Sequence, residues 1–297
     1  MDVTELIPTL DYVTSRYPRE AVQFAMEHRD EATPVLLACL EQTALEVSDE
    51  EPDTWGFVMA AIILGWMRET QAHPHLLALI SLPGEMPHTL FGDTLTEDVA
   101  QLLWETSGGE IQSLNGLSRN RNLNPYVRCN GAEAMMFGVA EGRLEREQLM
   151  ALLVEYLTEE EDPERPFTED DRLFFSSCAH NLCELYPASY RDVLDEAYAQ
   201  GRIELDYIAP EDVAMELSKP EAEVLAGFRQ RHLTRLQRDP HERMSWWASF
   251  NPQSGGWSEP LTPELLAYMR NQRKAKRKAV KKRRNKRGRK KRSRNKR

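Results

Sequence analysis

The sequence has no long hydrophobic run. Its longest, at residues 58–67, is about half the length that a helix needs to cross a bilayer. The first ten residues contain two acidic side chains and no basic one, so they do not resemble the basic start of a secretory signal. We therefore predict a soluble, cytoplasmic protein without membrane insertion.

Cysteine is scarce as well. The four thiols, Cys39, Cys129, Cys178 and Cys183, are irregularly spaced, and a chain of 297 residues does not need disulfide staples. We expect reduced and mostly buried thiols. Cys178, His180 and Cys183 are zinc-ligand types, but on a helix positions 178 and 180 point about 200° apart and no second ligand pair is evident. We predict no metal site there.

Motifs of the common enzyme classes are missing. The chain has no phosphate-cradling glycine loop, no nucleophile elbow and no HExxH sequence. His73 and His75 flank a proline at a predicted helix start, with no third ligand nearby in the sequence. The acidic clusters at 49–53 and 159–164 lack the spacing of a calcium loop and are typical of solvated turns. We expect neither a cofactor nor an enzymatic activity.

Lysine is nearly absent until the C-terminus: Lys219 is the only lysine among the first 269 residues. Residues 270–297 hold nineteen of the 38 Lys and Arg residues and no acid. The preceding 269 residues therefore carry nineteen basic and 48 acidic side chains, a net charge of −29. The overall charge of −10 combines an acidic body with a basic tail, and such asymmetry indicates a tail with its own partner.

Alternating β-branched runs are also missing, and apolar residues recur instead with the helical period, as at Leu149, Leu152, Leu153 and Tyr156. Prolines fall where helices are expected to begin. We predict an N-cap at Thr33 before Pro34. The spacings Thr94 to Glu97 and Thr168 to Asp171 fit capping boxes. The body is predicted to be all-α.

The predicted helix starts lie about 15–22 residues apart, so a helix pair occupies about 35–45 residues, the period of HEAT and armadillo repeats. We predict an all-α, HEAT-like α-solenoid of stacked helical hairpins, followed by a disordered basic C-terminal tail. An irregular helical bundle is the alternative.

Residues 124–136, Asn-Pro-Tyr-Val-Arg-Cys-Asn-Gly-Ala-Glu-Ala-Met-Met, resemble the second helix of a HEAT repeat. From about residue 3 to 230 the chain resembles the bacterial DUF1186 family of unknown function. The resemblance is carried by the segments 10–12, 17–21, 81–85 and 92–98. It implies a HEAT-like fold and no established activity, so no catalytic residue is transferred. The zinc-binding SEC-C motif that ends many members is absent, because no cysteine follows Cys183.

These patterns divide the chain into three parts: a helical-repeat domain at 1–238, a Pro/Gly/Trp-containing linker with a short helix at 239–269, and the polybasic tail at 270–297. The linker contains Trp246, Trp247, Phe250 and Trp257. Side chains of this size seldom remain in water, so we expect the segment to pack along the last repeats as a cap. A docking peptide for a partner protein is the alternative.

The tail is the predicted site for a polyanion. Nucleic-acid phosphates are the commonest partner of such a run, and binding should weaken steeply with salt. Because no aromatic residue follows Tyr268, base stacking is unavailable and binding should lack sequence specificity. The predicted contact residues are Arg273, Lys274, Lys276, Arg277, Lys278, Lys281, Lys282, Arg283, Arg284, Lys286, Arg287, Arg289, Lys290, Lys291 and Arg292.

Arg231, Arg235 and Arg238 share one face of a predicted helix. They either complement the end of that helix or extend the footprint of the tail.

The composition favours a non-enzymatic adaptor. Its repeat surface would bind an unknown protein partner, and its tail would tether the complex to RNA, the ribosome or DNA. Two alternatives are a metal-dependent hydrolase with acidic residues on its inner face, and a structural protein whose tail neutralises its own body.

Overall fold

The structure is a computed structural model, and it describes residues 1–11, 16–47 and 56–250. The chain divides into two compact units. The described part of the first unit comprises residues 1–11, 18–47 and 56–244, and that of the second comprises residues 16–17 and 245–250.

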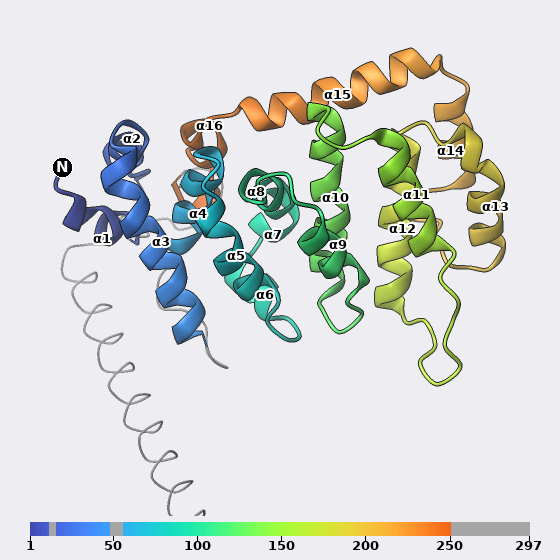
Figure 1. The fold of residues 1–297 in the computed structure, drawn as a ribbon, viewed down its shortest axis with the longest axis horizontal. Coiled ribbons are helices and arrows are strands. Elements are labelled where there is room, and N and C mark those ends of the chain that lie inside the picture. The colour runs from blue at the N-terminus through green and yellow to red at the C-terminus, as the bar shows by residue number, and fades with distance from the viewer. Residues whose placement is uncertain (12–15, 48–55, 251–297) are drawn as a thin grey trace, which may run out of the picture. The chain divides into compact units, whose positions relative to one another are not determined.

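The described residues form sixteen α-helices, four short 3-10 helices and no strand; one isolated bridge joins Asp162 to Arg165. This confirms the predicted all-α fold (Figure 1). The first eight α-helices are α1 (Leu6–Leu10), α2 (Arg19–Glu27), α3 (Arg29–Glu46), α4 (Gly56–Trp66), α5 (His73–Ile80), α6 (Met86–Phe91), α7 (Thr94–Glu97) and α8 (Val99–Thr106). The others are α9 (Gln112–Arg119), α10 (Pro125–Glu141), α11 (Arg146–Leu157), α12 (Glu169–Glu184), α13 (Arg191–Ala199), α14 (Pro210–Leu217), α15 (Glu221–Gln237) and α16 (Pro240–Met244). The 3-10 helices are η1 (Val3–Glu5), η2 (Thr70–Ala72), η3 (Ala188–Tyr190) and η4 (Ala248–Phe250).

Four helices form a central row in the first unit. The helix α4 packs against α8, α8 against α10, and α10 against α12. We call these four helices the inner row. Outer helices pair with them: α3 with α4, α5 with α8, α9 with α10, and α11 with α12 (Figure 1). Every residue of α8 is buried, so the core follows the inner row from hairpin to hairpin.

The helix α10 shows how local sequence sets the ends of an element. Pro125 occupies the first turn, where its missing N–H has no helical partner to lose, and the side chain of Asn124 accepts a hydrogen bond from the backbone N of Tyr126 at 3.0 Å. Gly142 ends the helix in the left-handed conformation, with φ 73°. This is the helix that the HEAT-like segment predicted.

Two of the predicted helix starts are wrong. Pro34 lies inside α3, which begins five residues earlier at Arg29, so Thr33 is not an N-cap. The acidic Asp30 and Glu31 lie in the first turn of α3, where the helix dipole favours negative charge. Thr94 is the first residue of α7 and does not cap it.

A glycine permits the close packing of the inner row. A Cβ built on Gly138 of α10 would lie 2.7 Å from the indole ring of Trp104, a fully buried residue of α8. The small residue therefore lets the two helices approach with the largest buried side chain between them.

The last two helices return along the array. In Figure 1, α15 runs from α14 back over α10, and α16 lies near α2 and α4. Contacts agree, because α15 packs against α10 and α12 while α16 packs against α4 and α2. His241 of α16 forms a hydrogen bond with Gln23 of α2 at 2.9 Å. The first unit thus extends to Met244, beyond Arg238 where we placed the end of the repeat domain.

Part of the predicted linker therefore belongs to the helical body, and it packs near the first repeats, not the last ones. In the second unit, Phe250 stacks on Trp247 with ring centroids 6.1 Å apart and contacts Tyr17 edge to face at 5.3 Å. Trp246 is exposed. Trp257, the predicted short helix and the tail lie outside the described residues.

Candidate binding surface

Charged side chains join α15 and α16 to the inner row. We define the C-terminal strap as α15 and α16 together, residues 221–244. Three arginines of the strap point to carboxylates on or beside the inner row, and the pairs are Arg231 with Glu184, Arg235 with Glu133, and Arg243 with both Asp98 and Glu105. The strap is therefore attached to the inner row at several points and occupies these carboxylates.

Arg243 is the most deeply buried of these cations, with 2% of its side chain exposed. Its Nη1 lies 2.9 Å from Oε2 of Glu105, and its Nη2 lies 3.1 Å from Oδ1 of Asp98. Burial alone would lower the pKa of Arg243, but the two carboxylates raise it above the ordinary value. The guanidinium therefore remains charged, and it compensates carboxylates that would otherwise be buried alone.

Arg235 connects three elements. Its Nη1 lies 3.0 Å from Oε1 of Glu133, and its Nη2 donates a hydrogen bond to the backbone O of Glu97 at 2.7 Å. The guanidinium also lies 5.0 Å from the centre of the Phe137 ring, a cation–π arrangement. The backbone O of Arg235 in turn accepts a hydrogen bond from Gln101 at 3.2 Å. These contacts favour a structural role for Arg235.

Arg231 and Arg238 complete the predicted face. Arg231 donates a hydrogen bond to Glu184, so two of the three cations are engaged within the chain. Arg238 caps α15, is exposed, and forms no ion pair with any described residue. Sequence reasoning found the shared face of Arg231 and Arg235 but missed Arg243, because a lone arginine after a proline has no periodic signal.

The same pairs bear on the hydrolase alternative. That alternative needs carboxylates free to act on the inner face, whereas Asp98, Glu105 and Glu133 are each paired with an arginine of the strap. Within the described residues, no three His, Cys, Asp or Glu side chains come together as a potential metal site.

Cys178, His180 and Cys183, which the sequence analysis considered as zinc ligands, differ in their exposure to solvent. The Cys178 side chain is buried and its pKa is raised by burial, while His180 is exposed and its ring faces Tyr207 at 6.3 Å. Cys183 is also buried, and burial raises its pKa to about 11. All four cysteines are free. Cys39 and Cys129 are half-buried, and burial raises the pKa of these two thiols as well. Four protonated thiols, two of them buried, fit the structural role that the sequence favoured.

His73 forms a contact that the sequence did not reveal. Its Nδ1 lies 2.9 Å from Oγ1 of Thr106 and its Nε2 lies 3.0 Å from Oγ of Ser113. Because the Thr106 hydroxyl donates to Leu102 O, Nδ1 is assigned as the donor to Thr106. The carboxylate of Glu110 accepts a hydrogen bond from the Ser113 hydroxyl at 3.0 Å. Both hydrogen-bonded neighbours of the imidazole are therefore hydroxyls, whereas in a catalytic triad a carboxylate orients the histidine.

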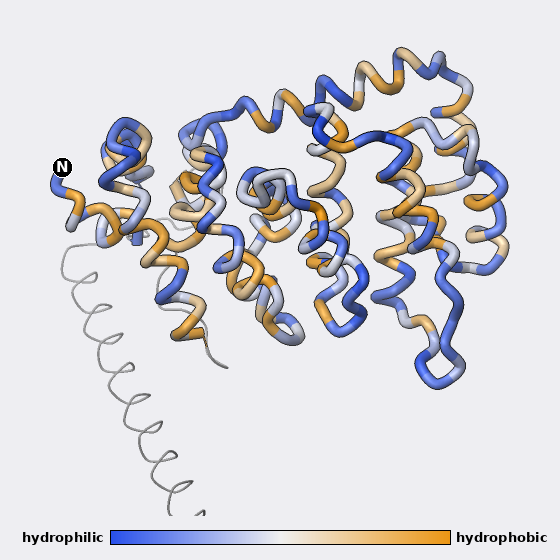
Figure 2. The backbone as a smooth tube through the Cα atoms, in the orientation of Figure 1, coloured by the Kyte–Doolittle hydropathy of each residue, from blue (hydrophilic) through white to orange (hydrophobic). Residues whose placement is uncertain are grey.

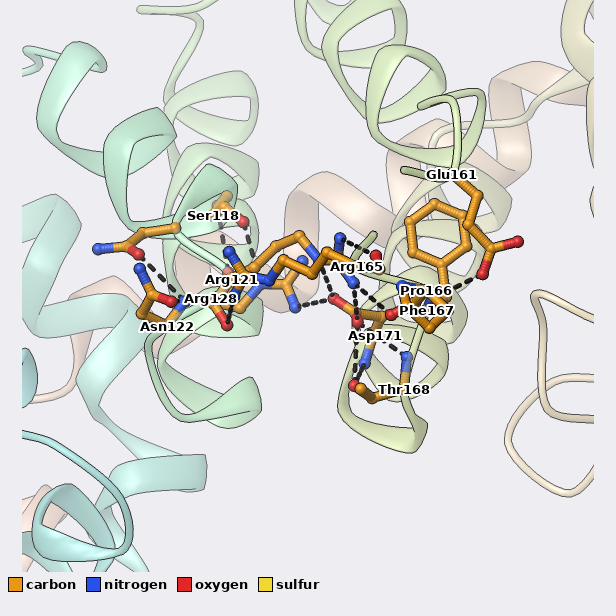
Figure 3. Close-up of polar contacts among 11 residues, drawn as sticks. Ser118, Arg121, Asn122, Arg128, Glu161, Arg165, Pro166, Phe167, Thr168 and Asp171 are labelled. Carbon is orange, nitrogen blue, oxygen red and sulfur yellow. Dashed lines mark hydrogen bonds and ion pairs between the residues drawn. The ribbon is translucent and has the colours of Figure 1, made fainter. Parts of the chain in front are cut away.

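A second charged cluster joins neighbouring hairpins around Asp171 (Figure 3). Oδ2 of Asp171 lies 2.6 Å from Nη2 of Arg121, and Oδ1 lies 2.7 Å from Nη1 of Arg128. Thr168 and Asp171 also form the capping box that the sequence predicted. Burial raises the pKa of Asp171, but hydrogen bonds from Arg121, Thr168 and Arg128 outweigh it and lower the pKa far below the ordinary value.

The predicted acidic cluster at 159–164 lies in the loop between α11 and α12, and all of its residues are exposed. This loop is largely hydrophilic in Figure 2. Arg202 donates hydrogen bonds to the backbone O of Leu157 and of Glu159, and Arg165 donates one to the backbone O of Arg121. The loop is therefore attached to the body at several points. The whole cluster at 49–53 lies outside the described residues, as do all fifteen predicted tail contacts.

No helix in the described part of the chain is long and apolar enough to cross a membrane.

Comparison with known proteins places the chain among uncharacterised relatives. An uncharacterised protein of Chlamydia trachomatis serovar D is 29% identical over 215 residues, which cover 72% of this chain and 83% of that protein. One from Chlamydia muridarum is 28% identical, with 72% and 84% covered. No solved structure gives a significant match. The sequence model of the DUF1186 family, described as proteins of unknown function, matches residues 1–251, so the chain belongs to this family.

Proposed function

We propose that this protein is a non-enzymatic adaptor whose basic tail holds it on the phosphate backbone of a nucleic acid, while its helical body binds another protein. The observation that carries the proposal is the separation of charge along the chain: nineteen cations and no acid at 270–297, against a net charge of −29 before them. The family match transfers no activity, because the family is described as having unknown function.

Polyanion binding follows from the density of the tail charge. Lys and Arg that neutralise phosphates release condensed counterions, so the affinity falls with salt by about 0.7 logarithmic units per neutralised phosphate for each tenfold rise in salt on single strands. The acidic body repels phosphate, which leaves the tail as the favoured contact. RNA, the ribosome and DNA share this chemistry, and the proposal places the protein in the cytoplasm.

The ion pairs of the arginines in the body support phosphate binding by the tail without help from the body. Arg231 and Arg235 form ion pairs with Glu184 and Glu133, so using them for phosphate would require those pairs to open. The tail also lies beyond residue 251, where the match to the family model ends. We therefore assign nucleic-acid binding to the tail and protein binding to the family-wide body.

The test compares the full chain with a variant that lacks residues 271–297. Using a fluorescent single-stranded RNA of mixed sequence, we expect the full chain to bind and to lose about 10³-fold or more in affinity between about 50 and 200 mM salt, as for about seven or more phosphate contacts at the single-strand slope. The truncated chain should show no salt-sensitive binding and an unchanged circular dichroism spectrum.

A variant in which residues 271–297 are shuffled without changing composition is the matched control. It should bind as the full chain does, because the tail is proposed to read charge and not sequence. Equal RNA binding by the truncated chain, or loss of binding in the shuffled chain, would contradict the proposal.

A further inference from the structure

Three large apolar side chains are exposed within one short segment near the end of the array. Seven large hydrophobic residues are notably exposed in the described chain, and three of them fall within residues 205–215: Leu205 at 64%, Tyr207 at 46% and Met215 at 57%. Single exposed apolar residues are ordinary, whereas three within residues 205–215 offer several apolar contacts to one partner segment. The segment spans α14 and the turn before it, near the end of the helical array opposite α2 (Figure 1).

The turn is held in place by its neighbours. The hydroxyl of Tyr198 donates a hydrogen bond to the backbone O of Ile208 at 3.1 Å. The ring of Tyr207 meets that of His180 edge to face, at 6.3 Å and 82°. A tyrosine that is positioned before binding loses little conformational entropy, which is why such residues are common anchors in interfaces.

The part of the chain that contains these apolar residues is strongly acidic. Residues 155–217, which we call the acidic pole, contain eighteen acidic and four basic side chains. Several of the acids are exposed and take part in no ion pair between described residues: Glu160, Glu164, Asp206 and Glu211. A partner for this surface therefore needs positive charge as well as apolar side chains.

The chain's own tail meets only half of this requirement. Within residues 270–297 the apolar side chains are Ala275, Ala279 and Val280, so the tail has nothing large enough to cover Leu205 or Tyr207. The strap also carries the chain away from the acidic pole: α15 follows α14, and α16 packs against α2 and α4 at the other end of the array.

We propose that the acidic pole, which includes Leu205, Tyr207 and Met215, is the docking surface for a lysine- and arginine-rich segment of another protein that contains large apolar side chains. This deepens the proposed function by naming the surface and the partner chemistry of the adaptor body. The inner row is a poorer candidate, because the strap already pairs with its carboxylates.

Two synthetic peptides test the proposal against the full-length protein by fluorescence anisotropy. The first is a copy of residues 273–292, and the second is the same peptide with the substitutions A275L, A279L and V280F. We expect the second peptide to bind about tenfold more tightly or better, as burial of three added apolar groups allows.

Three variants of the full chain locate the site. The pair L205S/Y207S should weaken binding of the apolar peptide about tenfold and leave the first peptide within about twofold, since only the apolar contact is lost. The acidic-pole variant E160Q/E164Q/D206N/E211Q should weaken the binding of both peptides. Its matched control, E20Q/D30N/E31Q/E41Q, changes four exposed acids at the other end of the array.

Three outcomes would overturn the proposal: equal losses in the control variant, no response of the apolar peptide to L205S/Y207S, or equal affinity of the two peptides. Equal affinity of the two peptides would instead make the acidic pole a binding site for the chain's own tail. RNA binding by L205S/Y207S, measured in parallel, should equal that of the unaltered protein. Failure of peptide docking is thereby separated from failure of the tail's nucleic-acid binding.

Discussion

Among single residues, Asp171 joins α12 to the preceding hairpin through Arg121 and Arg128. Asp171 and Arg128 are almost completely buried, at 4% and 2% side-chain exposure. Opening a buried pair by removing one partner costs about 3–5 kcal/mol, because the other charge remains without compensation. We predict that Asp171→Asn lowers the free energy of unfolding by this amount near neutral pH, as measured in urea.

The pH dependence follows from the lowered pKa of Asp171. A carboxyl whose folded pKa is depressed stabilises the fold fully above its unfolded pKa, about 3.9, and this stabilisation is lost as the pH falls toward the folded pKa. The difference between the protein and Asp171→Asn should therefore shrink below about pH 4. The exposed Asp195, paired with Arg191, gives the control: Asp195→Asn should change stability by about 0.5 kcal/mol or less at any pH. If the stability difference between the protein and Asp171→Asn persists in acid, the lowered pKa assigned to Asp171 is contradicted.

Sequence reasoning reached part of this cluster. The spacing of Thr168 and Asp171 predicted the capping box, because a local motif depends only on residues a few positions apart. Arg121 and Arg128 were not predicted as its partners, since pairing across about fifty residues depends on how the hairpins stack. The same limit hid the contact of His73 with Ser113.

Among the helices, α16 is fixed to α8 by the buried Arg243. We predict that Arg243→Met destabilises the protein by about 3–5 kcal/mol, because Asp98 and Glu105 then lie buried without a cation. The triple variant D98N/E105M/R243M should recover much of the loss, since the uncompensated charges are removed as well. Chemical denaturation monitored by circular dichroism measures both, with the exposed Arg191→Met as a control. Absence of any recovery in the triple variant would show that packing, not charge, holds α16.

Helices were predicted best where local signals agree. In α10 the cap, the proline and the terminal glycine all coincide with the observed ends. In α3 the local signals compete. Pro34 resembles a helix start, but Asp30 and Glu31 favour an earlier first turn, and the hairpin contact with α4 also supports a helix that begins at Arg29. The path of α15 and α16 was not predictable, because it depends on ion pairs with residues more than one hundred positions away.

For the chain as a whole, the proposed function depends on the basic tail remaining available while an acidic body of net charge −29 folds by itself. Like charges on the body repel one another, and salt screens this repulsion, since the Debye length falls to about 10 Å at 0.1 M. A tail bound to the body would reduce the repulsion at low salt. The salt dependence of stability therefore reports whether the tail charge is engaged by the body.

We predict that raising the salt from about 20 to about 300 mM increases the thermal midpoint by a few degrees, and by the same amount in the full chain and in the chain without residues 271–297. A change of about 1 kcal/mol corresponds to about 2–4 °C in a domain of this size. Differential scanning calorimetry at several salt concentrations measures the two curves. If the full chain is more stable at low salt and the difference vanishes at high salt, the tail is neutralising its own body. RNA would then have to displace an intramolecular partner, and the affinity of the full chain for RNA should rise when Glu160 and Glu164 are changed to glutamine.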